Sequence, residues 1–253
     1  MIKLDPNQWN LVYNVFSFGL VSMLACTVYT LVSQARVLPK YRNALVMSSM
    51  VTFIAGYHYW RIFNSFSEAS KGGLTIDVSG KPGSFNEAYR YVDWLLTVPL
   101  LLVEVVAVLA LAATVAKSLI MRLVPASAAM IALGYPGEVA SEQGTQILYG
   151  VLSTIPFIYI LYVLFVELTK SLDRQPAGVA ASVKNLRLLL LATWGVYPIA
   201  YMFNIWGDAG ADSFVAIQLG YTIADVLAKC VFGLTILKIA RMKSHAEGMA
   251  ADH

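Results

Sequence analysis

Charged residues are scarce in this sequence. Only 13% of its 253 residues are Asp, Glu, Lys or Arg, whereas 58% are hydrophobic, and a soluble domain is typically about 25% charged. Polar linkers, low-complexity tracts and convincing internal repeats are also missing. This composition excludes an ordinary soluble protein and leaves almost no residues for a soluble domain beside the apolar segments.

Cysteine is nearly absent, and the sequence has no recognisable cleavable leader. The two cysteines, Cys26 and Cys230, lie in different apolar segments, so they indicate neither a disulfide framework nor a metal site. The first apolar segment lacks a basic leader and a small-residue cleavage site, and it is longer than the apolar core of a signal peptide. We expect buried free thiols, no metal, and a first segment that stays in the mature protein.

Apolar runs that could cross a bilayer as helices, which takes about 20 residues, recur along the chain. Seven such runs cover residues 9–33, 43–66, 86–112, 118–137, 143–170, 181–206 and 214–240. Between the second and third, Leu74, Ile76 and Val78 alternate with polar residues in a stretch bounded by glycines, which predicts a small β-hairpin. We therefore expect an all-α membrane protein, with residues 1–253 forming a single seven-helix bundle.

Lysine and arginine are distributed unevenly over the connections between these runs. One set of connections contains Arg36, Lys40, Arg42, Lys117, Arg122, Lys170, Arg174, Lys184, Arg187, Lys238, Arg241 and Lys243, and the opposite set contains Lys3, Lys71 and Lys81. Positive residues mark the cytoplasmic side of a membrane protein. The N-terminus and the turn at residues 207–212 are thus expected outside, and the C-terminus inside.

The third run contains ionisable side chains, although a charge at the bilayer centre costs about 2.5–3.5 kcal/mol. At about 100° per residue, Arg90, Asp93, Thr97 and Glu104 fall within roughly 60° of one another and form one polar stripe. Glu104 lies about 16 Å along the helix axis from Asp93. The two carboxyl groups are therefore at different depths, as in a relay.

The seventh run contains Asp225 and Lys229, which lie on one helix face because they are four residues apart. One interpretation is a structural salt bridge, since buried charges are usually paired. The other includes Asp93 and Arg90 in a balanced cluster, in which a buried lysine could form a Schiff base with an aldehyde. The spacing leaves both interpretations open.

Several stretches of the sequence carry a family resemblance: "AGYHYWRIFNS", "AYRYVDWLLTVPLLLVE", "GYPGE", "STIPFIYILYVL", "WGVYPIAY" and "GYTIADVLAK". With these stretches the chain resembles the microbial (type 1) rhodopsins over nearly its full length, most of all the xanthorhodopsin and proteorhodopsin group. The resemblance implies all-trans-retinal bound as a Schiff base to Lys229. It also implies Asp93 as primary counterion and proton acceptor, Asp225 as second counterion, and Arg90 as an outer stabiliser of these acids.

The family distinguishes its ion pumps by three positions of the third helix, here Asp93, Thr97 and Glu104. This triplet resembles that of light-driven outward proton pumps, with Glu104 as the inner proton donor, and differs from the patterns of sodium and chloride pumps. The resemblance thus implies an ion transporter rather than an enzyme, in the cell membrane of a prokaryote. A sensory rhodopsin that signals to a partner protein and a retinal-free seven-helix transporter are the alternatives.

The resemblance also assigns a histidine and a pocket. A lone buried histidine is ordinarily a satisfied hydrogen-bonding group, but here the resemblance implies that His58 bonds Asp93 and, with Arg90 and Thr97, tunes it. Aromatic residues at helical spacing are ordinarily core packing. The resemblance instead implies a retinal pocket made of Trp94, Leu101, Gly134, Ser153, Pro156, Trp194, Tyr197, Pro198 and Tyr201, with hydroxyl groups from Thr97 and Ser153.

By the same resemblance, Gly150 takes a position that holds a tryptophan in bacteriorhodopsin. Glycine in a membrane helix is commonly a packing residue. The resemblance to the xanthorhodopsin group offers the alternative of a window for a hydroxylated carotenoid antenna such as lutein or zeaxanthin. It also implies a homo-oligomer, a trimer or pentamer, in the lipid bilayer, without nucleic acid or an obligate protein partner. The outer proton-release group stays open among Glu87, Glu138, Glu142 and Asp208.

Overall fold

The structure is a computed structural model that describes residues 1–167, 169–173, 175–206 and 210–249. Its α-helices are α1 (Pro6–Val32), α2 (Pro39–Ser70), α3 (Ala88–Leu109), α4 (Ala113–Glu138), α5 (Gln143–Tyr162), α6 (Thr169–Leu172), α7 (Ala177–Trp194), α8 (Val196–Trp206), α9 (Ala211–Asp225) and α10 (Phe232–Ala246). A 3₁₀ turn, η1 (Ser33–Arg36), follows α1, and two π-helical segments, η2 (Val163–Glu167) and η3 (Val226–Val231), follow α5 and α9.

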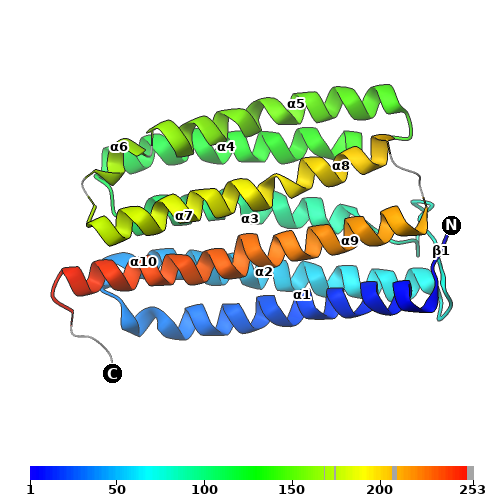
Figure 1. The fold of residues 1–253 in the computed structure, drawn as a ribbon, viewed down its shortest axis with the longest axis horizontal. Coiled ribbons are helices and arrows are strands. Elements are labelled where there is room, and N and C mark those ends of the chain that lie inside the picture. The colour runs from blue at the N-terminus through cyan, green and yellow to red at the C-terminus, as the bar shows by residue number, and fades with distance from the viewer. Residues whose placement is uncertain (168, 174, 207–209, 250–253) are drawn as a thin grey trace.

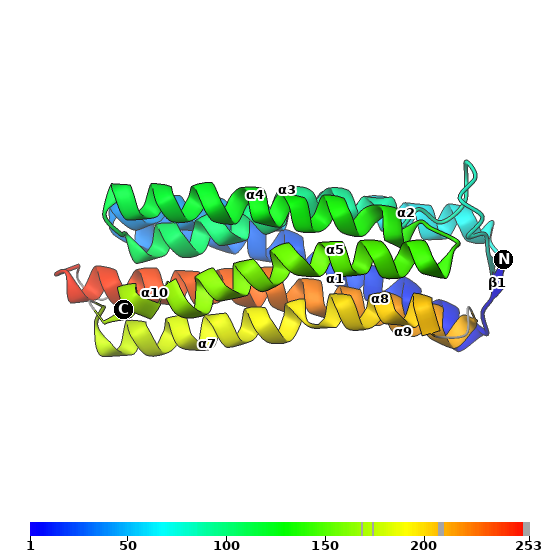
Figure 2. The same cartoon turned by 90° about the horizontal axis from the view of Figure 1, so that it is seen from above.

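These helices form seven rods that lie side by side, because α5 continues into η2, α7 into α8, and α9 through η3 into α10. The N-terminus and the end of α10 lie at opposite ends of the bundle (Figure 1). In the perpendicular view the rods still run along the full length of the molecule (Figure 2). The predicted seven-helix fold is therefore confirmed, and its orientation in a membrane stays a prediction.

Five helices in the described part of the chain are long and apolar enough to cross a membrane by length and composition. They lie within residues Pro6–Arg36, Ala88–Leu109, Ala113–Glu138, Gln143–Val166 and Gly178–Met202. The rods outside this set, α2 and α9–η3–α10, contribute many of the buried polar groups, including His58, Asp225 and Lys229. These two rods are polar where they line the interior.

The short strand pair joins the N-terminus to the connection between α2 and α3. Strand β1 (Ile2–Lys3) pairs antiparallel with β2 (Thr75–Ile76). The connection therefore contains the expected strand, whose partner is the N-terminal segment. Next to β1, Asp5 caps α1 by accepting hydrogen bonds from the backbone N–H groups of Asn7 (2.7 Å) and Gln8 (2.9 Å). The chain end is thereby fixed beside α2.

Candidate functional site

Lys229 lies in the middle of the bundle between two aspartates. Its Nζ donates a hydrogen bond to Asp93 Oδ2 at 2.9 Å and another to Asp225 Oδ1. The three residues are each at most 2% exposed. Lys229 belongs to the π-helical segment η3, directly after α9, and π-helical turns within α-helices occur frequently at functional sites. The charged side chains of α3 and of α9–η3 therefore lie together, as predicted.

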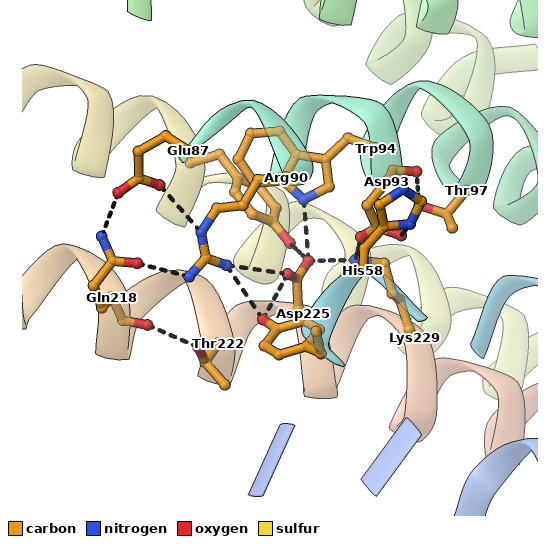
Figure 3. A network of polar contacts seen from close by, with 12 residues as sticks. His58, Glu87, Arg90, Asp93, Trp94, Thr97, Gln218, Thr222, Asp225 and Lys229 are labelled. Atoms are coloured by element: carbon orange, nitrogen blue, oxygen red, sulfur yellow. Dashed lines mark hydrogen bonds and ion pairs between the residues drawn. The ribbon is translucent and has the colours of Figure 1, made fainter. Parts of the chain in front are cut away.

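Asp225 is surrounded by hydrogen-bond donors from three further rods (Figure 3). Tyr59 donates to Oδ2 at 2.8 Å, while Tyr197 and Trp94 donate to Oδ1 at 2.7 and 3.2 Å. An ionised carboxylate only accepts hydrogen bonds, so this shell favours the charged form. Tyr59 is not among the site residues predicted from the sequence. The sequence feature that could have identified Tyr59 is its position directly after His58, in a stretch that carries the family resemblance.

Asp93 is less completely bonded than Asp225. Its Oδ1 is buried and has no hydrogen-bond partner in the described structure. His58 Nδ1 lies 4.0 Å from this oxygen and 2.9 Å from the carbonyl oxygen of Ile54. The predicted direct bond from His58 to Asp93 is therefore not formed here, because the carbonyl one turn earlier in α2 takes the Nδ1 hydrogen bond. His58 remains close enough to influence the carboxylate electrostatically.

Arg90 lies on the other side of Asp225 and begins a chain of contacts toward the end of the bundle that contains β1 and β2. Its Nη1 lies 3.8 Å from Asp225 Oδ2 and donates to Tyr59 Oη at 3.4 Å. Its Nη2 donates to Gln218 Oε1 at 2.8 Å, and Gln218 Nε2 donates to Glu87 Oε1 at 2.6 Å. Gln218 lies seven residues before Asp225, two turns along the same helix face. This spacing from Asp225 is the sequence feature that could have identified Gln218.

Glu104 is fully buried toward the opposite end of α3. Its Oε1 accepts a hydrogen bond from Ser48 of α2, and its Oε2 has no partner in the described structure. Gly233 leaves room for this contact, since a Cβ atom there would lie 3.2 Å from Ser48 Oγ. Glu104 is therefore a buried acid that is separate from the charge cluster and has Ser48 as its own hydrogen-bond partner.

A largely apolar cavity leads away from Lys229. The predicted pocket residues that line it are Trp94, Leu101, Gly134, Gly150, Ser153, Trp194, Tyr197, Pro198 and Tyr201, together with Lys229 itself. It is also lined by residues that are not among those predicted from the sequence: Tyr91, Val98, Met130, Ile131, Thr154, Phe157, Tyr221 and Ala228. Most of these lie on the same helices as predicted members, one to four residues away.

Two predicted pocket residues, Thr97 and Pro156, are not among the residues that line this cavity. The Thr97 hydroxyl donates instead to the carbonyl oxygen of Asp93 at 2.8 Å, so it is turned to the backbone of its own helix. Pro156 is half-buried in α5, and the cavity wall there is made by Ser153, Thr154 and Phe157. Thr97 on α3 and Pro156 on α5 are therefore the predicted pocket residues that lie outside the lining of the cavity.

Gly150 lines the same cavity and is only half-buried. A Cβ atom at this position would lie 3.1 Å from Cε1 of Tyr201. Any larger side chain would therefore press on the Tyr201 ring.

The candidate release groups differ in their surroundings. Glu87 contacts Gln218 and Arg90, whereas Glu138 accepts a hydrogen bond from Tyr91 at 3.2 Å. Glu142 is exposed and accepts from Thr145 at 3.1 Å. Asp208 lies outside the described residues, as does part of the predicted turn at 207–212.

Comparison with known proteins places these features in a family. A family model described as "Bacteriorhodopsin-like protein" matches residues 10–242. The chain belongs to the bacteriorhodopsin-like family. The predicted kinship with the microbial, type 1 rhodopsins is thereby confirmed.

Individual members of the bacteriorhodopsin-like family are similar over most of their length. The green-light absorbing proteorhodopsin of gamma-proteobacterium EBAC31A08 is 33% identical over 236 residues, covering 92% of this chain and 88% of the relative. The crystal structure of a thermophilic rhodopsin is 45% identical with a TM-score of 0.92, covering 98% of this chain and 100% of that one. The structure of xanthorhodopsin, described as a light-driven ion pump with dual chromophore, is 47% identical with a TM-score of 0.91 and covers 99% of this chain and 100% of that one.

Proposed function

We propose that this multi-pass membrane protein is a light-driven outward proton pump that binds all-trans-retinal as a Schiff base on Lys229. The observation that carries the proposal is that buried Lys229 lies at the wall of an aromatic cavity and is hydrogen-bonded to two aspartates. Membership of the bacteriorhodopsin-like family and the similarity to proteins named proteorhodopsin and xanthorhodopsin support it. On this proposal the protein is an ion transporter and not an enzyme.

The residues present fit retinal. The cavity is lined by flat rings, among them Trp94, Trp194 and Tyr197, which suit an elongated conjugated chain. Asp93 adds a buried, unpartnered Oδ1 beside the lysine, as a counterion for a cation there. When bound, retinal supplies a light-driven change of shape, and the protein supplies the order in which proton affinities change.

The two aspartates have different roles because their surroundings differ. The Lys229 nitrogen lies 2.9 Å from Asp93 Oδ2, so a proton on that nitrogen can be transferred directly. Asp225 is held ionised by Tyr59, Tyr197 and Trp94, so it competes poorly for that proton. Asp93 is therefore the acceptor, and Asp225 is the fixed counterion.

Glu104 returns a proton to the Lys229 nitrogen from the side of the bundle opposite to Arg90. It is a buried acid about 16 Å along α3 from Asp93, with Ser48 as its hydrogen-bond donor. Because the excess of Lys and Arg at that end favours the cytoplasm, donation by Glu104 and acceptance by Asp93 move protons outward. We place the protein in the cell membrane of a prokaryote, as a trimer or pentamer.

The proposal is tested by adding all-trans-retinal to the expressed retinal-free protein. A visible absorption band should form, and denaturation should leave retinal covalently attached. Lys229→Ala should stay colourless, while Lys243→Ala, at the end of α10, should bind normally. No band with the wild type, or a covalent adduct with Lys229→Ala, would overturn the assignment.

We further propose that a hydroxylated carotenoid such as lutein or zeaxanthin binds at Gly150 as an antenna. The half-buried glycine that lines the retinal cavity supports this, since a carotenoid ring on α5 would lie beside Tyr201 and close to that cavity. Excitation of the bound carotenoid should then sensitise retinal emission. Gly150→Trp should abolish this transfer and keep the retinal band, whereas equal transfer in both proteins would show that Gly150 is only a packing residue.

A further inference from the structure

The groups that bond Asp225 come from α2, α3, α8 and η3, and helix α1 meets one of them at a glycine. Gly19 lies on the buried face of α1. A Cβ atom at Gly19 would lie 2.6 Å from Cε1 and 2.7 Å from Cδ1 of Tyr59, and 3.0 Å from Cγ2 of Thr222. Carbon atoms in contact are normally about 3.5–4.0 Å apart. The Tyr59 ring therefore occupies the space that a side chain at Gly19 would need.

The Tyr59 ring is held from both sides. It is 1% exposed, and its hydroxyl donates to Asp225 Oδ2 at 2.8 Å and accepts from Arg90 Nη1 at 3.4 Å. The Arg90 guanidinium, which points from α3 toward Asp225 (Figure 3), lies 5.8 Å from the centre of the Tyr59 ring and 5.7 Å from that of Phe16 on α1. A shift of the ring away from α1 would therefore also shift the hydroxyl that bonds Asp225.

We propose that Gly19 is a positioning residue for the counterion Asp225, because it lets the Tyr59 ring pack against α1 where its hydroxyl bonds that carboxylate. This rests on the proposed function. Gly19 acts through Tyr59, and α1 thereby influences how firmly Asp225 keeps its negative charge beside Lys229. The proposal adds a helix outside the charge cluster to the elements that set its proton affinity.

The effect of losing the Tyr59 bond follows from the groups around the two carboxylates. Asp225 faces Tyr59, Arg90, Trp94, Tyr197 and Lys229, and Asp93 faces Lys229 and His58. Without the Tyr59 hydroxyl, Asp225 keeps its charge less well and attracts Lys229 more strongly away from Asp93. Both changes act in one direction, so the coupled pair of carboxylates takes up a proton at a higher pH.

The test is an acid titration of the visible band formed with all-trans-retinal. Protonation of the carboxylate pair should red-shift the band, and the midpoint should lie about one pH unit higher in Gly19→Ala than in the wild type, within the contribution of one hydrogen bond to a charged group. Tyr59→Phe should give a similar shift, and the double variant should add little to it. Gly56→Ala is the matched control on the same α1–α2 interface, where a Cβ atom would lie 3.3 Å from Leu24 Cδ2, and its midpoint should equal that of the wild type.

Unfolding of the retinal-free protein by denaturant provides a second readout. Gly19→Ala should lower the unfolding midpoint, and most of this loss should disappear when Tyr59→Val removes the ring. If Gly19→Ala forms no visible band, Tyr59→Val in the same chain should restore it.

An unshifted colour midpoint in Gly19→Ala would overturn the proposal and leave Gly19 as a packing residue. Equal losses of stability with and without the Tyr59 ring, or a band that Tyr59→Val does not restore, would also overturn it. If the wild type forms no band with retinal, the proposed function fails, whereas the unfolding comparison still decides the contact between Gly19 and Tyr59.

Discussion

Replacing Lys229 with methionine in the retinal-free protein tests the charge balance at the centre of the bundle. Methionine keeps an unbranched side chain of similar length but removes the positive charge from between Asp93 and Asp225. Removing one partner from a buried ion pair costs about 3–5 kcal/mol, because the other charge is left uncompensated. We expect Lys229→Met to lower the free energy of unfolding by about this amount.

The structure indicates which aspartate causes the loss. The Oδ2 of Asp93 is bonded by Lys229, and its Oδ1 has no partner in the described structure. Asp225 keeps three side-chain donors and Arg90 at 3.8 Å. A second substitution, Asp93→Asn, should therefore restore most of the lost stability, whereas Asp225→Asn should restore little.

The assay is a double-mutant cycle of unfolding in mixed detergent micelles, with helix content as the signal. Lys229→Met combined with Asp93→Asn should show a coupling energy of about 2–3 kcal/mol, within the range for residues in direct contact. Additive effects of the two substitutions would refute the reasoning. So would a larger recovery with Asp225→Asn, because Asp225 would then be the less compensated acid.

Further substitutions separate the remaining roles. Asp93→Asn should red-shift the visible band and abolish light-driven pH changes, because the anion beside the lysine is removed. Glu104→Gln should leave the band nearly unchanged and slow proton uptake about 10²-fold; equal effects of the two variants on colour would contradict their different depths. Gly137→Ala should lower the free energy of unfolding by about 1–3 kcal/mol, since its Cβ would lie 2.0 Å from the Tyr201 hydroxyl oxygen. Gly144→Ala, with no heavy atom closer than 3.7 Å, is the matched control, and an equal loss in both would refute this contact argument.

The polar face of α3 could be predicted from sequence because helical periodicity determines it. Arg90, Asp93, Thr97 and Glu104 are all at most 2% exposed, as expected for a stripe that faces the bundle interior. The seven rods follow in the same way from the length of the apolar runs. Both features depend on spacing within one segment, which the sequence contains directly.

Contacts between segments were harder to predict because they depend on how each helix is rotated about its axis. Tyr59 reaches Asp225 across the bundle, and His58 turns its Nδ1 to the carbonyl of Ile54 rather than to Asp93. Neither outcome follows from the spacing in α2. The pairing of β2 with the N-terminal strand also joins segments about 70 residues apart, which a local alternation pattern cannot reveal.

The most direct test of outward proton pumping is the pH of an unbuffered suspension of cells that contain the protein and all-trans-retinal. Illumination should acidify the medium, a protonophore should abolish the signal, and replacement of sodium or chloride should not change it. Lys229→Ala cells should show no response. Alkalinisation of the medium by the wild type, or a pH change that grows with the protonophore, would contradict outward proton transport.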